Sequence, residues 1–264
     1  MDSSLAWLSV IFDHPILFSV ATFILLALSA QLGAAILGRR RDPGEDIKDD
    51  FGMILAATLT LLGLIIGFSF SMAISRYDQR KNLEEEEANA IGTAYVRADL
   101  MPAADAARVR ALLKDYVDVR MEFYRSRGGE DLGSIAMRRA KLQADLWTAV
   151  QGSATAQPTA VMALVTKGMN DVLNAQGYTQ AAWWNRIPHA AWVLMILIAI
   201  CSNVLLGYGT HQTRAARRLL LVMPLVVSIS FLLIADIDSP RGGVIHVNPQ
   251  NLKSLADSLR SPSP

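Results

Sequence analysis

Side chains suited to acid–base or metal chemistry are few in this sequence and stand far apart. The four histidines are His14, His189, His211 and His246. None is four residues from another, the spacing that lets two histidines on one helix grip a zinc ion. The single cysteine, Cys201, excludes an intramolecular disulfide and disfavours a cysteine-based metal site. With no phosphate-binding loop and no GxSxG motif, the sequence predicts no catalytic residue, metal or cofactor, and therefore not an enzyme.

The densest run of charge is Glu84 to Glu87, four consecutive glutamates. On a helix these side chains point in all directions, so at most two of them can share one ligand. Two interpretations remain open. The run is either a solvated or ion-paired helix face, or it contains a cation site formed by two of its members.

A second group of charges stands beside long apolar stretches, where an unpaired charge is costly. Its members are Arg76, Asp78, Arg80, Asp236 and Asp238. Carboxylates so close to hydrocarbon need a partner, and Arg76 or Arg80 is the expected partner of Asp236 and Asp238. These residues are either structural ion pairs and anchors, or charges that attract ions to the mouth of a pore.

Four apolar stretches must position these charges. They run from about Pro15 to Gly38, Phe51 to Ile74, Ala190 to Tyr208 and Leu219 to Ala235. A helix of about 20 residues crosses the roughly 30 Å hydrocarbon core and satisfies its own backbone there. The fourth stretch is slightly short and contains Pro224. The sequence therefore predicts an all-α integral membrane protein with four transmembrane helices.

Between the second and third stretches the chain is charged and rich in helix formers. Apolar residues recur there at helical spacing, at Val109, Leu112, Leu113, Tyr116, Val119 and Phe123. We expect a helical extramembrane domain that continues from the second transmembrane helix, with Trp183, Trp184 and Arg186 as anchors at the membrane surface. The predicted division is an N-terminal transmembrane pair (1–74), this domain (75–188), a C-terminal transmembrane pair (189–238) and a polar tail (239–264).

The second transmembrane helix carries two stripes. The first consists of small residues one turn apart, Gly63, Gly67, Ser71 and Ser75. Small residues at this spacing let two helix backbones approach closely. The second stripe consists of Leu62, Ile66 and Phe70. Around a symmetry axis it would form a hydrophobic constriction; otherwise it packs against neighbouring helices or lipid.

Charge also bears on partners and orientation. The net charge of +1 gives no broad basic surface for nucleic acid. Basic residues gather in the two short loops, at Arg39, Arg40, Arg41, Lys48, Arg214, Arg217 and Arg218. Because basic short loops favour the cytoplasm, we expect both termini and the helical domain on the outer face of the membrane.

The segment from Leu61 to Pro102 resembles a family of bestrophin-like bacterial membrane proteins of unassigned function. The residues that carry the likeness are Gly67-Phe68, Arg76-Tyr77-Asp78, Arg80, Glu87-Ala88-Asn89-Ala90 and Arg97-Ala98-Asp99. Ala235-Asp236-Ile237-Asp238 with Gly242-Gly243 is similar to a further block of that family. A more distant likeness is to the bestrophins, pentameric anion channels whose second helix lines the pore.

The resemblance implies a homo-oligomeric channel for small anions in a bacterial plasma membrane, with the second transmembrane helices around the pore. Its partners would be membrane lipid, small inorganic ions and further copies of the chain. The alternative is a non-conducting membrane scaffold that binds a partner through its helical domain. A pore requires one side of the second helix to face a symmetry axis, and a scaffold does not.

Overall fold

The structure is a computed structural model in which residues 14–37, 45–129, 131–210 and 218–261 are described. Every regular element in these ranges is a helix, as the sequence predicted. The basic residues Arg39, Arg40, Arg41, Arg214 and Arg217, and also His211, lie outside the described residues. The chain divides into two compact units, residues 1–75 with 186–245 (unit 1) and residues 76–185 with 246–264 (unit 2).

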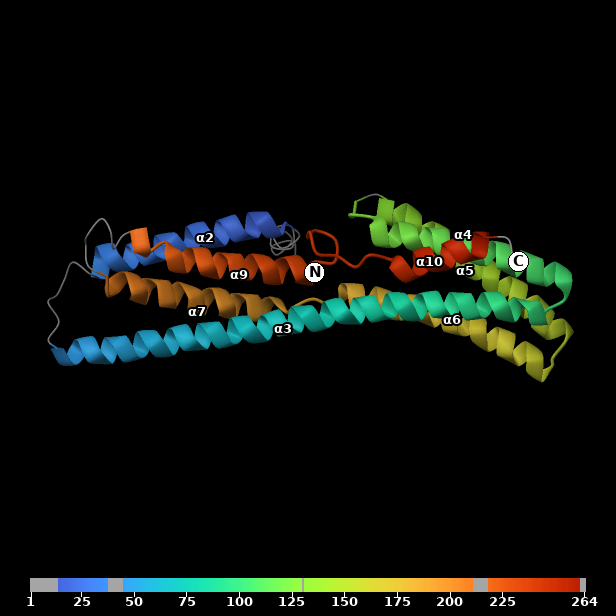
Figure 1. The fold of residues 1–264 in the computed structure, drawn as a ribbon, viewed down its shortest axis with the longest axis horizontal. Helices are drawn as coiled ribbons and strands as arrows, with labels where there is room; N and C mark the ends of the chain where they lie inside the picture. Colours follow the sequence, from blue (N-terminus) through green and yellow to red (C-terminus); the bar gives the residue numbers. More distant parts are fainter. Residues whose placement is uncertain (1–13, 38–44, 130, 211–217, 262–264) are drawn as a thin grey trace. The chain divides into compact units, whose positions relative to one another are not determined.

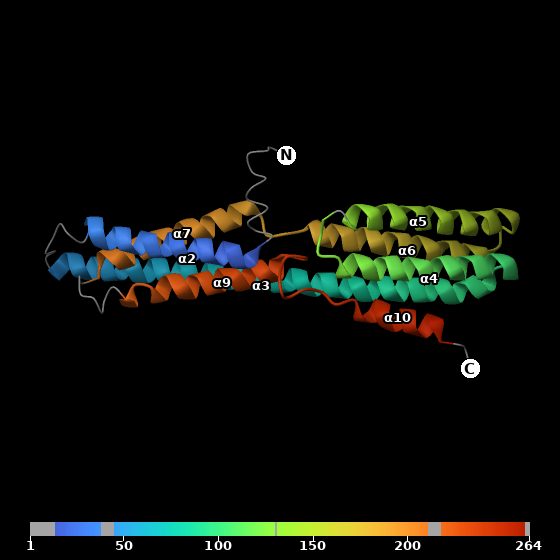
Figure 2. The ribbon, with the colours of Figure 1, turned by 90° about the horizontal axis from the view of Figure 1, so that it is seen from above.

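Unit 1 is a bundle of apolar helices. Its helices are α2 (Pro15–Leu32), α7 (His189–Tyr208), α9 (Val222–Asp238) and the first part of α3 (Glu45–Arg97). Helix α2 packs on both α7 and α9, and the helices run alongside one another in Figures 1 and 2. The ring of Phe18 meets that of Trp192 edge-on at 5.1 Å and stacks with Phe231 at 6.5 Å between centroids. These aromatic contacts hold the three helices together.

Two glycines allow α2 and α7 to cross closely. A Cβ atom at Gly207 would lie 1.9 Å from the carbonyl oxygen of Ala30, and one at Gly33 would lie 2.1 Å from that of Val204. Neither position has room for a side chain. Gly33 begins a short π-helical segment (Gly33–Leu37) that extends α2.

Unit 2 is a bundle of longer, amphipathic helices. They are the second part of α3, α4 (Ala103–Arg125), α5 (Asp131–Ala156), α6 (Ala160–Trp184) and the short α10 (Gln250–Arg260). Helix α5 packs on both α4 and α6, and Figure 2 shows it running beside α6. The predicted apolar positions Val109, Leu113, Tyr116, Val119 and Phe123 are buried in its core. Gly128 and Gly129, both at positive φ, follow the end of α4.

Three helical stretches are long and apolar enough to cross a membrane, Pro15–Ala35, Asp50–Leu100 and Ala160–Tyr208. Helix α9 has 17 residues, at the lower limit of about 17–25 for a spanning helix. A fourth span therefore stays a prediction. Of the two tryptophans expected as membrane anchors, Trp184 is 75% exposed and Trp183 only 5%. Trp183 packs instead on the rings of Phe123 and Tyr124, at 4.9 and 5.5 Å between centroids.

Candidate functional site on helix α3

Helix α3 is 53 residues long and continues from unit 1 into unit 2 without interruption. Its most apolar stretch is almost uncovered by the rest of the chain. Only 6% of that stretch is buried, against 39% for Pro15–Ala35 and 33% for Ala160–Tyr208. Because water does not solvate such a surface, it must be covered by something other than its own chain.

The predicted apolar line lies toward the covered side of this stretch. Leu62 is 1% exposed and Ile66 and Phe70 are half-buried. Ser69 and Ala73, also buried, lie on the same side of the helix. The single chain therefore encloses the first member of the line and partly covers the other two.

The small-residue stripe lies on the open side. Gly63, Gly67, Ser71 and Ser75 are all exposed. A Cβ atom at Gly63 or Gly67 would meet no other atom within 4 Å. The stripe thus makes no close helix contact within its own chain, and the tight crossing is instead that of Gly33 and Gly207. No regular spacing marks those two glycines, which is why the sequence did not reveal them.

Two large apolar side chains stand beside the stripe. Leu64 is 52% exposed and Phe68 is 64% exposed. They are one helical turn apart, so they lie on one side of α3. Thr60, one turn before Leu64, is exposed as well. The open side of α3 within its apolar stretch is therefore uncharged, with small residues and large apolar residues in adjacent lines.

The charges that follow the apolar stretch differ in exposure. Arg76 is half-buried as a residue, and its guanidinium donates a hydrogen bond to the Asn185 side-chain oxygen at 2.8 Å. Asp78 is exposed. Arg80 is only 2% exposed, so most of its side chain lies inside the protein. Arg76 thereby joins α3 to the residue that follows α6.

Asp236 and Asp238, at the end of α9, hold backbone segments of unit 1. The Asp236 carboxylate accepts hydrogen bonds from the amides of Val244 and Ile245, both at 2.8 Å. The Asp238 carboxylate accepts one from the amide of Ile187 at 3.1 Å. A side chain at Gly243 is excluded, because its Cβ would lie 2.5 Å from the Asp236 carbonyl oxygen. Pairing of these aspartates with Arg76 or Arg80 stays a prediction.

The four-glutamate run divides into two exposed and two buried residues. Glu85 and Glu86 are exposed, whereas Glu87 is fully buried. The Glu87 carboxylate forms an ion pair with the buried Arg120 of α4, whose Nη2 lies 3.1 Å from Oε2. The hydroxyls of Tyr124 and Thr179 donate to the same carboxylate at 3.4 and 3.2 Å. Burial, and then the charge of Glu87, raise the pKa of Tyr124, so its hydroxyl keeps the proton that it donates.

Glu84, the other buried glutamate, holds the C-terminal helix. Its carboxylate accepts a hydrogen bond from the amide of Leu252 at 2.9 Å and another from the Asn251 side chain at 2.7 Å. It therefore caps the N-terminus of α10, where free amides favour a negative charge. Among the residues that the structure describes, no three metal-ligating side chains come together. The run is thus a pair of structural anchors with two solvated neighbours.

Comparisons with known proteins agree on one family. Residues 20–252 match the Bestrophin-like domain family. No curated protein matches this sequence. A crystal structure of a bacterial bestrophin homolog from Klebsiella pneumoniae is similar, with a TM-score of 0.62, 12% identity, and coverage of 91% of this chain and 95% of that one.

Two related crystal structures match over similar lengths. A mutant of the Klebsiella pneumoniae homolog has a TM-score of 0.64 at 12% identity, covering 91% of this chain and 97% of that chain. A structure described as a mutant membrane protein has a TM-score of 0.63 at 12% identity, and the match covers 91% of this chain and 97% of that chain. At this identity the likeness shows a shared fold.

Proposed function

The chain belongs to the bestrophin-like family, as the motifs between Leu61 and Pro102 predicted, and we propose that it forms a homo-oligomeric channel for small anions. In this proposal, copies of α3 surround a central pore in the membrane. The characterised bestrophins are anion channels, and we therefore propose that the ions passing through this pore are anions. No acidic or basic residue interrupts α3 from Phe51 to Ile74, so the wall of the pore would be uncharged.

The observation that carries the proposal is the open apolar side of α3. A monomer would leave this surface to lipid alone, yet its small residues are of the kind that helices use to approach one another. Gly63 and Gly67 have free space around them in the single chain. We therefore assign the flank of α3 that bears the stripe to contact with a neighbouring copy.

A residue that lines a pore must be free of its own chain. Leu62, at 1% exposure, does not meet this condition, whereas Leu64 and Phe68 do. We therefore place the narrow part of the pore at Leu64 and Phe68, on the opposite side of the helix from the line of Leu62, Ile66 and Phe70. When copies of the helix surround the pore, these apolar side chains form a ring that closes it by excluding water.

In the membrane, we propose four spans per chain: α2, the apolar part of α3, α7 and α9. Unit 2 would be the extramembrane domain, and Arg76 would stand where α3 leaves the membrane. We propose a bacterial plasma membrane, with unit 2 and both termini on the outer face. The uneven distribution of basic residues between the short loops and the N-terminal segment supports this orientation.

Two measurements test assembly and conduction separately. The mass of the protein in detergent should be that of a uniform oligomer, and Gly67→Leu should make it smaller or heterogeneous. The matched control is Gly152→Leu on α5, where a Cβ atom also meets nothing within 4 Å. Wild-type protein in liposomes should release chloride faster than empty liposomes do. A uniform oligomer without ion flux would favour the non-conducting scaffold, with unit 2 as its partner-binding part.

A further inference from the structure

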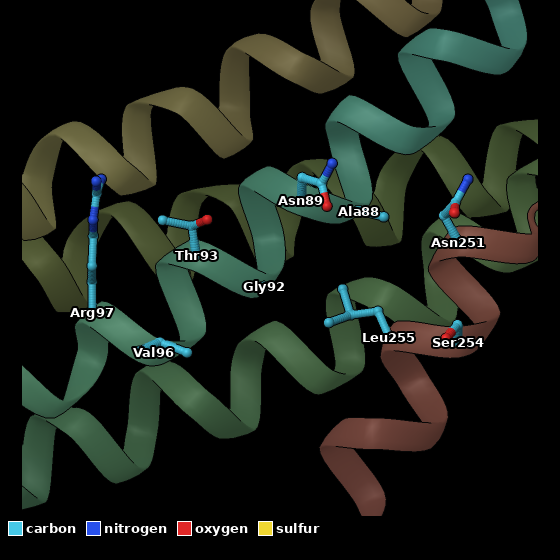
Figure 3. A pocket seen from close by; sticks show the side chains of 9 residues that line it. All are labelled: Ala88, Asn89, Gly92, Thr93, Val96, Arg97, Asn251, Ser254 and Leu255. Atoms are coloured by element: carbon cyan, nitrogen blue, oxygen red, sulfur yellow. The ribbon is translucent and has the colours of Figure 1, made fainter.

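We propose that a groove between α3 and α10 in unit 2 binds a small organic carboxylate, with Arg97 as its anion-binding residue. The groove is open to solvent and has a volume of about 620 Å³. Figure 3 shows Asn251, Ser254 and Leu255 of α10 at one end of it and Arg97 of α3 at the other, where the arginine side chain extends toward α6. Its size lies within the roughly 300–1,000 Å³ of sites that hold small molecules.

Polar side chains from both helices line the groove. Asn89, Thr93 and Arg97 follow one another at four-residue intervals along α3, and Asn251 and Ser254 stand on α10. Asparagine, threonine and serine each supply a donor and an acceptor, and arginine supplies donors only. Since the Asn251 amide group already donates to Glu84, the groove offers chiefly the polar groups of Asn89, Thr93 and Ser254, and one positive charge.

Arg97 is held in position by α6. Its Nη1 donates to the Leu164 carbonyl oxygen at 3.5 Å. Its side chain fills the space beside Gly168, where a Cβ atom would lie 3.1 Å from Nη1 and 3.2 Å from Cδ. Within the described part of the chain, no carboxylate forms an ion pair with Arg97. The remaining guanidinium donors are thus available to a ligand, and an arginine fork fits a carboxylate with two parallel hydrogen bonds.

The charge of the lining selects the ligand class. No aspartate, glutamate or lysine is among the described lining residues, and Arg97 is the one charged residue there. One guanidinium balances one carboxylate, whereas a phosphate monoester carries up to two negative charges. Ala88, Val96 and Leu255 supply apolar surface beside the polar groups. The ligand that fits is a monocarboxylate with a small apolar body.

The α10 wall of the groove is firmly attached. Leu252 is fully buried, and its amide is held by Glu84. At the other end of α10, Arg260 forms an ion pair with Asp118 of α4. Leu255 reaches across to Gly92, where a Cβ atom would come within 3.2 Å of its side chain. The groove is therefore formed before a ligand arrives, which lowers the cost of binding.

The test uses the full-length protein in detergent with benzoate as the probe and benzamide as its neutral counterpart. Calorimetric titration should show benzoate binding that Arg97→Gln weakens at least tenfold. Arg108→Gln, which removes an exposed arginine of α4 outside the groove, should leave the affinity unchanged. Benzamide should bind at least tenfold more weakly than benzoate, because it lacks the charge that Arg97 recognises.

A second variant, Thr93→Val, keeps the side-chain shape and removes the hydroxyl, and should weaken benzoate binding two- to fivefold. Thermal unfolding of each variant checks that it is folded. The proposal is overturned if benzoate does not bind the wild type, if folded Arg97→Gln binds it as well as the wild type does, or if benzamide binds equally. Because no ion flux is measured, failure here leaves the channel proposal standing.

Discussion

At the scale of single residues, the ion pair of Glu87 and Arg120 joins α3 to α4 inside unit 2. Both side chains are fully buried, and Arg120 also lies over the ring of Phe123, with its guanidinium carbon 4.4 Å from the ring centroid. The sequence marked Glu87 as part of an acidic run and of the motif Glu87-Ala88-Asn89-Ala90, but not as the partner of Arg120. Helical spacing could not show which glutamates face inward, because their partners Arg120 and Leu252 are 33 and 168 residues away.

Glu87→Gln should destabilise unit 2 strongly, because it leaves the Arg120 charge buried without its counter-charge. Breaking a buried pair from one side typically costs about 3–5 kcal/mol. Thermal unfolding followed by circular dichroism would measure the loss. The matched control is Glu122→Gln, which breaks the exposed pair with Arg138 and should leave the midpoint nearly unchanged. Equal midpoints for both variants would contradict a structural role for the buried pair.

At the scale of helices, the contrast is between two kinds of glycine. Gly33 and Gly207 lie where α2 and α7 touch, and Gly63 and Gly67 lie where α3 touches nothing in its own chain. The sequence predicted the helices themselves from hydrophobic length and period. It did not predict the side of α3 that the chain covers, because every residue from Phe51 to Ile74 is uncharged and the apolar pattern alone does not distinguish the two sides.

Gly207→Ala should lower the stability of unit 1, because the added methyl group collides with the backbone of Ala30 and the helices must separate. Overpacking of this kind costs about 1–3 kcal/mol. Gly52→Ala on α3 is the control, since its methyl group has free space, it lies outside the small-residue stripe, and alanine favours a helix more than glycine does. Thermal unfolding in detergent should place Gly207→Ala below the wild type and Gly52→Ala at or above it. The reverse order would mean that the α2–α7 crossing is not as close as described.

At the scale of the whole molecule, two parts of the chain far apart in sequence complete each unit. Residues 186–245 join the N-terminal helices, and residues 246–264 join the helical domain. The sequence predicted a polar tail from Ser239, and the structure contains the helix α10 within this segment. Its attachment to unit 2 depends on Glu84, which no local pattern reveals.

Orientation in the membrane can be tested with one new cysteine. Ser134 on α5 is exposed, and Cys201, itself exposed, must first be replaced by serine. In that background, Ser134→Cys should react with a membrane-impermeant maleimide in intact cells, because the basic short loops favour the cytoplasm. A cysteine placed at Arg218 should react only after the membrane is permeabilised. Labelling of Ser134→Cys only after permeabilisation would reverse the predicted orientation.

The central claim, that copies of α3 surround an anion pore, is tested most directly by chloride release from liposomes. Wild-type protein should exceed empty liposomes, and Phe68→Ala should release chloride several-fold faster, because it widens and wets the proposed constriction. Phe70→Ala, on the half-buried side of α3, should match the wild type. Faster release with Phe70→Ala or Ile66→Ala and not with Phe68→Ala would move the pore to the line of Leu62, Ile66 and Phe70. If the wild type and all variants match empty liposomes for both chloride and sodium, the channel account is contradicted.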